Sequence, residues 1–294
     1  MVVSRNFNIK VIILKRSIGQ MKILVTGANG FLGRGIITEL IKQGNEVIAT
    51  DFETSLVSEM AFRIDSNIFE VEDPYVFYGK PDQVLHLAWR DGFIHNSFAH
   101  SEDLSKHITF LNKMVLAGVK ISVMGTMHEI GFYEGSIDEH TPCYPANYYG
   151  IAKDALRNFV VNMTEDAGLQ YQWLRAFYIV DNTSYGSSIF SKIVAAEKDD
   201  KTFFPFTTGK NQFDFLDYPE FCYQVAATVS QDKVNGIINI CSGNPMKLSE
   251  RVENFISENG FKIQLEYGAF PDRKYDSKAV WGNNKKIEQI LAEK

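Results

Sequence analysis

Short apolar runs alternate with longer segments of helical periodicity along the first half of the chain. The runs are rich in β-branched residues and bounded by Gly, Asp or turn residues, and they read "KILVT", "NEVIAT", "DQVLHLA" and "KISVMG". They predict buried strands. Residues 31–42 and 102–117 place apolar side chains at helical spacing. This alternation predicts an α/β fold with a doubly wound parallel sheet, whose ligand lies beyond the carboxyl ends of the strands.

The pattern loosens after about residue 179 into shorter elements separated by Gly, Asn and Pro. We therefore expect a nucleotide-binding domain over residues 21–178. A smaller substrate-binding lobe should occupy most of residues 179–294, with some segments returning to the first domain.

The first 20 residues are basic and contain no acid, and their apolar core, Val11 to Leu14, is too short for a membrane span or a secretory signal. We interpret residues 1–20 as a disordered extension or as the product of an upstream start codon. An organellar targeting segment is the alternative.

Charge and cysteine usage narrow the class of protein. The net charge is −6, and because the first 20 residues carry four basic side chains and no acid, the remainder carries −10. This disfavours nucleic-acid binding, which needs a basic surface. The three cysteines lack the spacing of a metal site, and so do the six histidines. The composition predicts a cytoplasmic protein without a metal site or a membrane span.

A glycine-rich turn carries the first candidate chemistry. Gly27, Gly30 and Gly33 follow the first predicted strand and open the first predicted helix. Their missing side chains allow a tight turn and close approach of a pyrophosphate to the helix N-terminus. Asp51 ends the second strand 18 residues after Gly33, where a carboxylate binds the adenosine ribose. Because this carboxylate would repel a 2′-phosphate, we predict NAD(H) in preference to NADP(H).

Tyr149 and Lys153 form the only Tyr-x-x-x-Lys in the sequence, within "ANYYGIAKDAL". The spacing places both side chains on one face of a helix. An ammonium near a phenol stabilises the phenolate, so we expect Lys153 to lower the pKa of Tyr149.

Together these features resemble the extended short-chain dehydrogenase/reductase family, the NAD-dependent epimerase/dehydratase group, from Met21 almost to the C-terminus. The matching segments are Thr26-Gly27-x-x-Gly30-x-x-Gly33, Asp51, "HLA" at 86–88, Thr126, Tyr149/Lys153 and "LRAF" at 174–177, with weaker matches in "FDFLD" at 213–217 and "NICSG" at 239–243. The resemblance implies a Rossmann-like fold and a nucleotide-sugar substrate.

The resemblance also implies roles for particular residues. Tyr149 would donate the proton, and Thr126 would orient the carbonyl. Lys153 would lower the pKa of Tyr149 and hold the nicotinamide ribose. The implied cofactor contacts are Gly27, Asn29, Gly30, Phe31, Leu32, Gly33, Asp51, Leu87, Ala88, Trp89, Tyr149, Lys153 and Phe177.

The segment after Thr126 bears on the reaction type. Dehydratases of this group carry Thr-Asp-Glu there, whereas this chain has Thr126-Met127-His128, which argues against dehydration. Glu129 comes one position late and should face away from the site in a structural role. "GTMHEIG" at 125–131 and "YDSKAVWGNN" at 275–284 resemble dTDP-4-keto-6-deoxyhexose reductases, which make sugars such as dTDP-fucose for surface polysaccharide (O-antigen) biosynthesis. A 4-epimerase with tightly held NAD and a non-catalytic dinucleotide sensor are the alternatives.

The predicted substrate contacts are less regular. Relatives have an Asn where this chain has Tyr178, and an Arg that clamps the diphosphate where it has Phe213. Arg273 could supply that charge instead. Arg90 and Asp91 either face the sugar or form a surface pair. The candidate substrate residues are Arg90, Thr126, Met127, His128, Tyr178, Asn182 and Arg273.

The resemblance further suggests a homodimer formed through the helix at residues 102–117 and the Tyr149 helix. The apolar stripe on the first of these helices permits such a contact, but it could equally belong to the core.

Overall fold

A computed structural model describes residues 20–184, 186, 188–272 and 277–293. Most of the predicted extension at residues 1–20 lies outside these ranges, as does the candidate substrate residue Arg273.

The elements up to β7 are β1 (Lys22–Thr26), α1 (Phe31–Lys42), β2 (Glu46–Asp51), β3 (Phe62–Asp65), α2 (Pro74–Phe77), β4 (Gln83–His86), α3 (Ala99–Leu116), β5 (Lys120–Thr126), η1 (Met127–Glu129), β6 (Gly135–Ile137), α4 (Tyr148–Asp166) and β7 (Tyr171–Ala176).

The remaining elements are shorter on average, as the sequence pattern predicts. They are β8 (Tyr178–Val180), α5 (Ile189–Lys198), β9 (Phe203–Pro205), β10 (Gln212–Asp217), α6 (Tyr218–Val229), β11 (Gly236–Ile240), β12 (Pro245–Lys247), α7 (Leu248–Glu258), β13 (Gln264–Glu266), β14 (Ala279–Gly282) and α8 (Lys285–Ala292).

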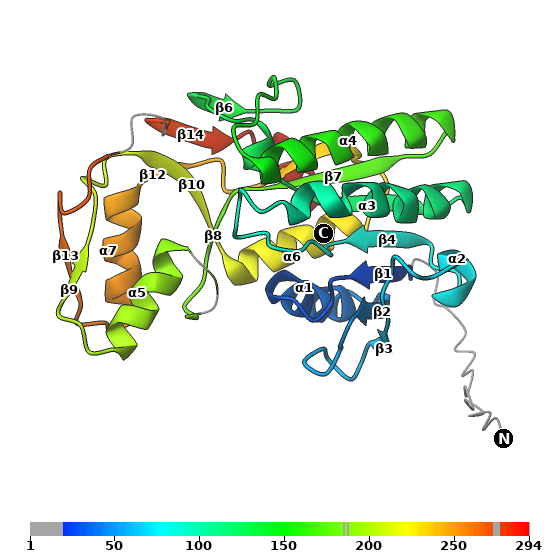
Figure 1. Cartoon of the computed structure of the whole chain (residues 1–294), viewed down its shortest axis with the longest axis horizontal. Coiled ribbons are helices and arrows are strands. Elements are labelled where there is room, and N and C mark those ends of the chain that lie inside the picture. The colour runs from blue at the N-terminus through cyan, green and yellow to red at the C-terminus, as the bar shows by residue number, and fades with distance from the viewer. Residues whose placement is uncertain (1–19, 185, 187, 273–276, 294) are drawn as a thin grey trace.

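A seven-stranded sheet in the order β11-β7-β5-β4-β1-β2-β3 forms the centre of the larger part of the molecule, and every neighbouring pair is parallel (Figure 1). The predicted doubly wound fold is confirmed. The chain runs outward from β1 through β2 and β3 and then returns to β4 on the other side of β1. This reversal lies between β1 and β4, and such a point in a parallel sheet is where ligands bind.

Helices cover both faces of this sheet. On one face, Ile36 and Leu40 of α1 pack with Phe221 and Val225 of α6 and with residues of α8. On the other face, apolar residues of α3 and α4 pack over β1, β4 and β5. These faces are apolar because strands buried on both sides need apolar residues at successive positions. The sheet is therefore held between two helical layers, and its carboxyl edge positions the loops of the candidate site.

Much of the later chain, together with β6, forms a smaller lobe at the carboxyl side of the sheet (Figure 1). Residues 135–137 thus lie outside the large sheet, although the sequence places them in the first domain, 21–178. Strands β12, β10, β14 and β6 form a second sheet, and β8 also pairs with β10. Helices α5 and α7 share a core that includes Phe190, Val252 and Phe255. Not all of the later chain belongs to this lobe, because β11 joins the large sheet and α6 packs on α1. No helix in the described ranges is both long enough and apolar enough to span a bilayer.

Candidate active site

The glycine turn lies at the carboxyl end of β1. Gly27 has a φ of +68°, and a Cβ there would lie 2.6 Å from the backbone nitrogen of Ala88. A Cβ on Gly33 would lie 2.5 Å from the carbonyl oxygen of Gly27, so only glycine lets α1 pack against the turn. The turn therefore has the tight geometry that the sequence predicts for a pyrophosphate site.

The start of α1 fits an anion. Gly30 is the N-cap residue and offers no side-chain hydrogen bond to the first amides of the helix, which include those of Phe31 and Leu32. These amides and the helix dipole favour a phosphate at this position. Nearby, Asp51 ends β2, and its carboxylate accepts a hydrogen bond from the Asn29 amide at 3.0 Å. Asp51 therefore lies directly beside the turn, as expected for a residue that binds the adenosine ribose.

The ends of β1 and β4 are joined by hydrogen bonds at the point where the strand order reverses. Thr26 Oγ1 lies 2.8 Å from His86 Nδ1 and accepts from the Ala88 amide at 3.3 Å, while the Leu87 amide donates to the Thr26 carbonyl. β4 ends at His86, so Leu87 and Ala88 belong to the loop, not to the strand as the pattern "DQVLHLA" indicates. These contacts bring the predicted cofactor residues Leu87, Ala88 and Trp89 next to the glycine turn.

Helix α4 brings Tyr149 to the end of β5. The helix is capped by Asn147, whose side chain accepts from the Gly150 amide at 2.8 Å. A Cβ on Gly150 would lie 2.4 Å from the carbonyl oxygen of His128, so the helix start packs directly on η1. Thr126 ends β5, and a hydrogen bond joins it to Tyr149. The structure therefore brings Thr126, Tyr149 and Lys153 together, as predicted.

The pKa of Tyr149 is raised in this structure and not lowered as the sequence predicts. Burial raises the pKa of Tyr149 to about 12, and the hydrogen bond from Thr126 only partly offsets it. Lys153 Nζ lies 5.9 Å from the centre of the Tyr149 ring and donates to the Met124 carbonyl at 2.9 Å. Sequence spacing showed that the two side chains share a helix face, but it did not show that Lys153 would be buried and Tyr149 partly buried. At pH 7 Tyr149 is therefore a neutral phenol, which can donate a proton.

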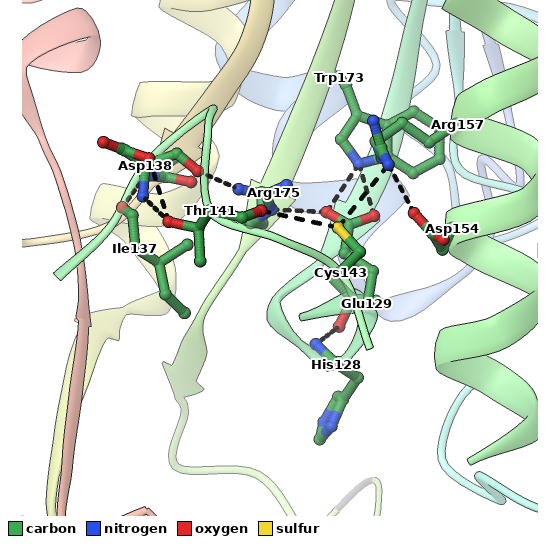
Figure 2. A network of polar contacts seen from close by, with 12 residues as sticks. His128, Glu129, Ile137, Asp138, Thr141, Cys143, Asp154, Arg157, Trp173 and Arg175 are labelled. Atoms are coloured by element: carbon green, nitrogen blue, oxygen red, sulfur yellow. Dashed lines mark hydrogen bonds and ion pairs between the residues drawn. The ribbon is translucent and has the colours of Figure 1, made fainter. Parts of the chain in front are cut away.

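Glu129 has the structural role that the sequence indicates, for a different reason. It lies in the 3-10 turn η1 rather than on a strand, and Figure 2 shows its carboxylate on the side opposite the His128 ring. The carboxylate lies 2.5 Å from Arg175 Nε and accepts from Trp173 Nε1 at 3.0 Å, and both charged side chains are fully buried. Burial raises the pKa of Glu129, and the Arg175 guanidinium counteracts this. Glu129 thus holds η1 against β7.

A cluster of histidines around Tyr149 was missed by the sequence analysis. The rings of His95, His100 and His128 lie 5.4–6.0 Å from the Tyr149 ring, and His86 Nε2 lies 2.9 Å from His107 Nδ1. The one available signal was that five of the six histidines fall between residues 86 and 128. The described residues contain no group of three or more His, Cys, Asp or Glu arranged to hold a metal ion. His86 is a hydrogen-bonded core residue, as predicted.

The buried histidines predict loss of stability in acid. Burial lowers the pKa of His107 to about 3 and that of His86 well below its usual value. Because the unfolded chain binds these protons more tightly, stability should be intact above pH 6.5 and fall as the pH decreases toward 3. We expect His107 alone to lower the free energy of unfolding by about 2 kcal/mol at pH 5, compared with its value above pH 6.5.

Urea unfolding at pH 7.5 and 5 in His107→Phe measures this cost, since the variant should lose less stability between the two pH values than the wild type. His140 is the matched control, because its side chain is 86% exposed. An identical loss in wild type and His107→Phe would contradict the assignment.

Three candidate substrate residues have partners in the structure. The Arg90 guanidinium pairs with Glu102 and Asp103 of α3 at 2.9 and 2.8 Å, whereas Asp91 accepts from Ser97. The Tyr178 ring packs against Phe213 at a centroid distance of 4.8 Å, so Phe213 belongs to an aromatic cluster and not to a diphosphate clamp. Asn182 donates to Asn259 Oδ1 at 3.2 Å. Their contacts with a sugar remain predictions.

The other candidates lie closer to the Tyr149 site. His128 follows Thr126 in η1, and its amide donates to Thr126 Oγ1 at 3.2 Å. Met127 is partly buried against the core that contains Phe177. Phe177 is itself buried, and its ring lies 3.0 Å from where a Cβ of Gly282 would be. Phe177 therefore packs in the core with residues of β6, β10 and β14.

The parallel sheet, the glycine turn and the Thr-Tyr-Lys group together define a Rossmann-fold enzyme of the dinucleotide-dependent class. The chain belongs to the NAD dependent epimerase/dehydratase family, whose model matches residues 23–241. It is 40% identical over 269 residues to a dTDP-6-deoxy-L-talose 4-dehydrogenase (NAD(+)) of Aggregatibacter actinomycetemcomitans, covering 89% of this chain and 99% of that protein.

Solved structures share the fold. A UDP-glucose 4-epimerase from Stenotrophomonas maltophila with bound NAD and formylated UDP-arabinopyranose superposes with a TM-score of 0.82 at 17% identity, over 93% of each chain. A UDP-glucose 4-epimerase from Thermus thermophilus in complex with NAD gives 0.75 at 17% identity, also over 93% of each. The predicted family and fold are thus confirmed, and the chain is a nucleotide-sugar enzyme of this family.

Proposed function

We propose that this protein catalyses the NAD(H)-dependent reduction of the 4-keto group of a nucleotide-linked 4-keto-6-deoxy sugar. The observation that carries the proposal is the neutral phenol of Tyr149 beside Thr126, because reduction of a ketone needs a proton donor at the carbonyl oxygen. The 40% identical relative is named as a 4-dehydrogenase of a dTDP-linked 6-deoxy sugar. Oxidation of a C4 hydroxyl is the reverse of 4-keto reduction and uses the same groups.

The cofactor residues fit a dinucleotide. The glycine turn leaves room that a Cβ would fill, the first amides of α1 suit a pyrophosphate, and the Asp51 carboxylate suits ribose hydroxyls. Gly27, Gly30, Gly33 and Asp51 would hold NAD(H), which when bound supplies the hydride.

Each of the three candidate catalytic residues would have its own role in the reduction. Thr126 Oγ1 and Tyr149 Oη would hold the carbonyl oxygen of the sugar between them and polarise the carbonyl. Tyr149 gives its proton to that oxygen as the carbon is reduced, so that a hydroxyl forms and a phenolate remains. The ammonium of Lys153 stabilises this phenolate, and a proton from solvent then restores the phenol.

The sugar is assigned by its chemistry. Thr126-Met127-His128 lacks the paired carboxyls that a dehydratase uses, so the 4-keto-6-deoxy group must already exist in the substrate. Substrates of both hexose series deserve testing: dTDP-4-dehydro-6-deoxyglucose and the corresponding 6-deoxy-L-sugar, since the relative is named for an L-talose derivative.

The test is to mix the purified full chain with NADH and each dTDP-, UDP-, GDP- and CDP-linked 4-keto-6-deoxy sugar in turn. We expect NADH to be oxidised in equal amount to the 6-deoxy sugar formed, with a dTDP-sugar fastest. Isomerisation of a nucleotide sugar without net NADH loss would instead indicate a 4-epimerase. Tight NADH binding without turnover of any of these sugars would indicate a dinucleotide sensor.

Asp51 gives a prediction about cofactor choice. Asp51→Ala should weaken NADH binding by about 10- to 100-fold, because the ribose hydroxyls lose a charged hydrogen-bond acceptor. NADPH binding should improve relative to NADH, since the repulsion of its 2′-phosphate is removed. Dissociation constants from quenching of protein fluorescence measure both. Glu53→Ala is the control, because this exposed carboxylate lies two residues further along. An unchanged NADH to NADPH ratio would contradict the role of Asp51.

We also propose that the protein is a homodimer through α3 and α4. The two helices pack together, and large apolar side chains are exposed on them and at their ends. Leu116 is 78% exposed, Ile151 50% and Phe159 51%. Exposed large apolar side chains on two neighbouring helices support a contact there.

A further inference from the structure

Trp89 contacts both members of the Tyr149/Lys153 pair. It lies three residues after the end of β4, and the Lys153 Nζ lies 3.9 Å from the centre of its ring. The Tyr149 ring meets the indole edge-on, with the ring centres 6.2 Å apart. Trp89 is therefore placed to act on the chemistry through these two residues.

The Lys153 ammonium has no negatively charged side chain in direct contact among the described residues. The side chain is 2% exposed, and it forms no ion pair with any residue that the structure describes. Glu129 acts on it from a distance, Tyr149 is neutral, and His86 and His107 lie close enough to interact with it electrostatically. The face of an indole carries negative electrostatic potential and attracts a cation most strongly where water is excluded. Trp89 thus supplies an attraction that no described carboxylate supplies by direct contact.

The indole is itself fixed in place. Its Nε1–H donates to His100 Nδ1 at 3.0 Å, and its ring stacks on His107 with the centres 4.6 Å apart. Because the indole nitrogen can only donate, His100 Nδ1 must be the acceptor. His100 Nε2 then carries the proton and donates to the Ile94 carbonyl at 3.0 Å. This chain of contacts fixes the plane of the ring that Lys153 faces.

We propose that Trp89 is a positioning residue for the catalytic pair: its indole face holds the Lys153 ammonium in place and in its charged form beside Tyr149. The inference rests on the proposed function, because Lys153 must be charged to stabilise the phenolate that forms when Tyr149 gives up its proton. The carbonyl reduction itself needs no contact between Trp89 and the sugar.

The titration of Lys153 provides a direct measurement. Burial lowers the pKa of Lys153 to about 7, whereas the pKa of His107 is lowered to about 3 and that of His128 to about 4. These values separate Lys153 from His107 and His128. Lys120, at the amino end of β5, has a pKa lowered to about 8 by burial and serves as an internal reference.

The experiment is an NMR titration of the full chain labelled with ¹³C at the lysine ε-carbons, with the Lys153 signal assigned by its absence in Lys153→Met. In Trp89→Leu, which removes the aromatic face, the Lys153 midpoint should fall by about one pH unit. In Trp89→Phe, which keeps a weaker face but loses the bond to His100, the midpoint should fall by less. The Lys120 midpoint should stay unchanged in both variants.

A second measurement does not depend on whether these variants fold. Replacing the tryptophans with fluorinated tryptophan withdraws electron density from the ring face and hardly alters its shape. This should also lower the Lys153 midpoint. An unchanged Lys153 midpoint in the fluorinated protein, or equal midpoints in Trp89→Leu and wild type, would overturn the proposal.

Turnover adds a readout that separates this proposal from the proposed function. The alkaline limit of kcat should move to lower pH in Trp89→Leu together with the Lys153 midpoint, whereas the KM for the keto sugar should change little. If no sugar is turned over, the proposed function fails and the lysine titration still decides whether Trp89 holds the Lys153 charge. If turnover occurs but the alkaline limit does not move in Trp89→Leu, the role of Trp89 is wrong and the proposed function stands.

Discussion

Replacing Tyr149 by phenylalanine is expected to lower the turnover of the 4-keto-6-deoxy sugar by about 100- to 10,000-fold. The variant removes the hydroxyl that would protonate the carbonyl oxygen and leaves the ring in place. NADH affinity should be nearly unchanged, because the glycine turn and Asp51 would hold the cofactor.

The fold should tolerate this change. The Tyr149 ring is held by its aromatic neighbours, with the His95 ring stacked at an angle of 11° and the Trp89 ring edge-on. A phenylalanine ring keeps these contacts and also removes the cost of burying a hydroxyl. A loss of turnover would therefore report on chemistry and not on unfolding.

The measurement combines kcat from the loss of NADH absorbance with the dissociation constant of NADH from fluorescence. Tyr148→Phe is a closely matched control, because Tyr148 is the preceding residue of α4 and is 45% exposed. It should retain wild-type turnover. If Tyr149→Phe turned over at the rate of the wild type, Tyr149 would not be the proton donor.

The second large effect is expected at the buried Glu129–Arg175 pair. Glu129→Gln or Arg175→Met should each lower the free energy of unfolding by about 3–5 kcal/mol, because each leaves one charge buried without its partner. The pair lies fully buried between η1 and β7, and Arg175 Nη1 also donates to the Asp138 carbonyl at 2.9 Å (Figure 2). Little water can reach the remaining charge.

Urea unfolding of the single and double variants checks this. The double variant Glu129→Gln/Arg175→Met should lose less stability than the sum of the single variants, because neither charge then remains. At the surface, Glu293→Gln breaks a pair with Lys233 whose side chains are 43% and 69% exposed, and it should cost less than about 1 kcal/mol.

The same variants test whether Glu129 takes part in catalysis. Under conditions where Glu129→Gln is folded, its kcat should be close to that of the wild type, because the carboxylate is directed at Arg175 and Trp173. A stable Glu129→Gln that had lost turnover would assign the carboxylate to the reaction instead.

The order of strands and helices along the chain could be predicted from the sequence, because it depends on residues that are close together in the sequence. Apolar runs with strand and helix periods predicted β1, β2, β4, β5 and α1, and residues 31–42 match α1 at both ends. The glycine turn, Asp51 at the end of β2 and the shared face of Tyr149 and Lys153 follow from spacings of a few residues. Parallel sheets place such strand ends at one edge, which is why these local signals also located the site.

The electrostatics of the site were decided only by the tertiary structure. The contacts of Trp89 with Lys153, of Glu129 with Arg175 and of His86 with His107 join segments 21 to 64 residues apart. Their geometry depends on how strands and helices pack, which no short stretch of sequence specifies. Burial then sets the charges, since the energy of an ionised group depends on how much water reaches it. For this reason the sequence determined which groups form the site, whereas only the folded chain decided that burial raises the pKa of Tyr149 and lowers that of Lys153.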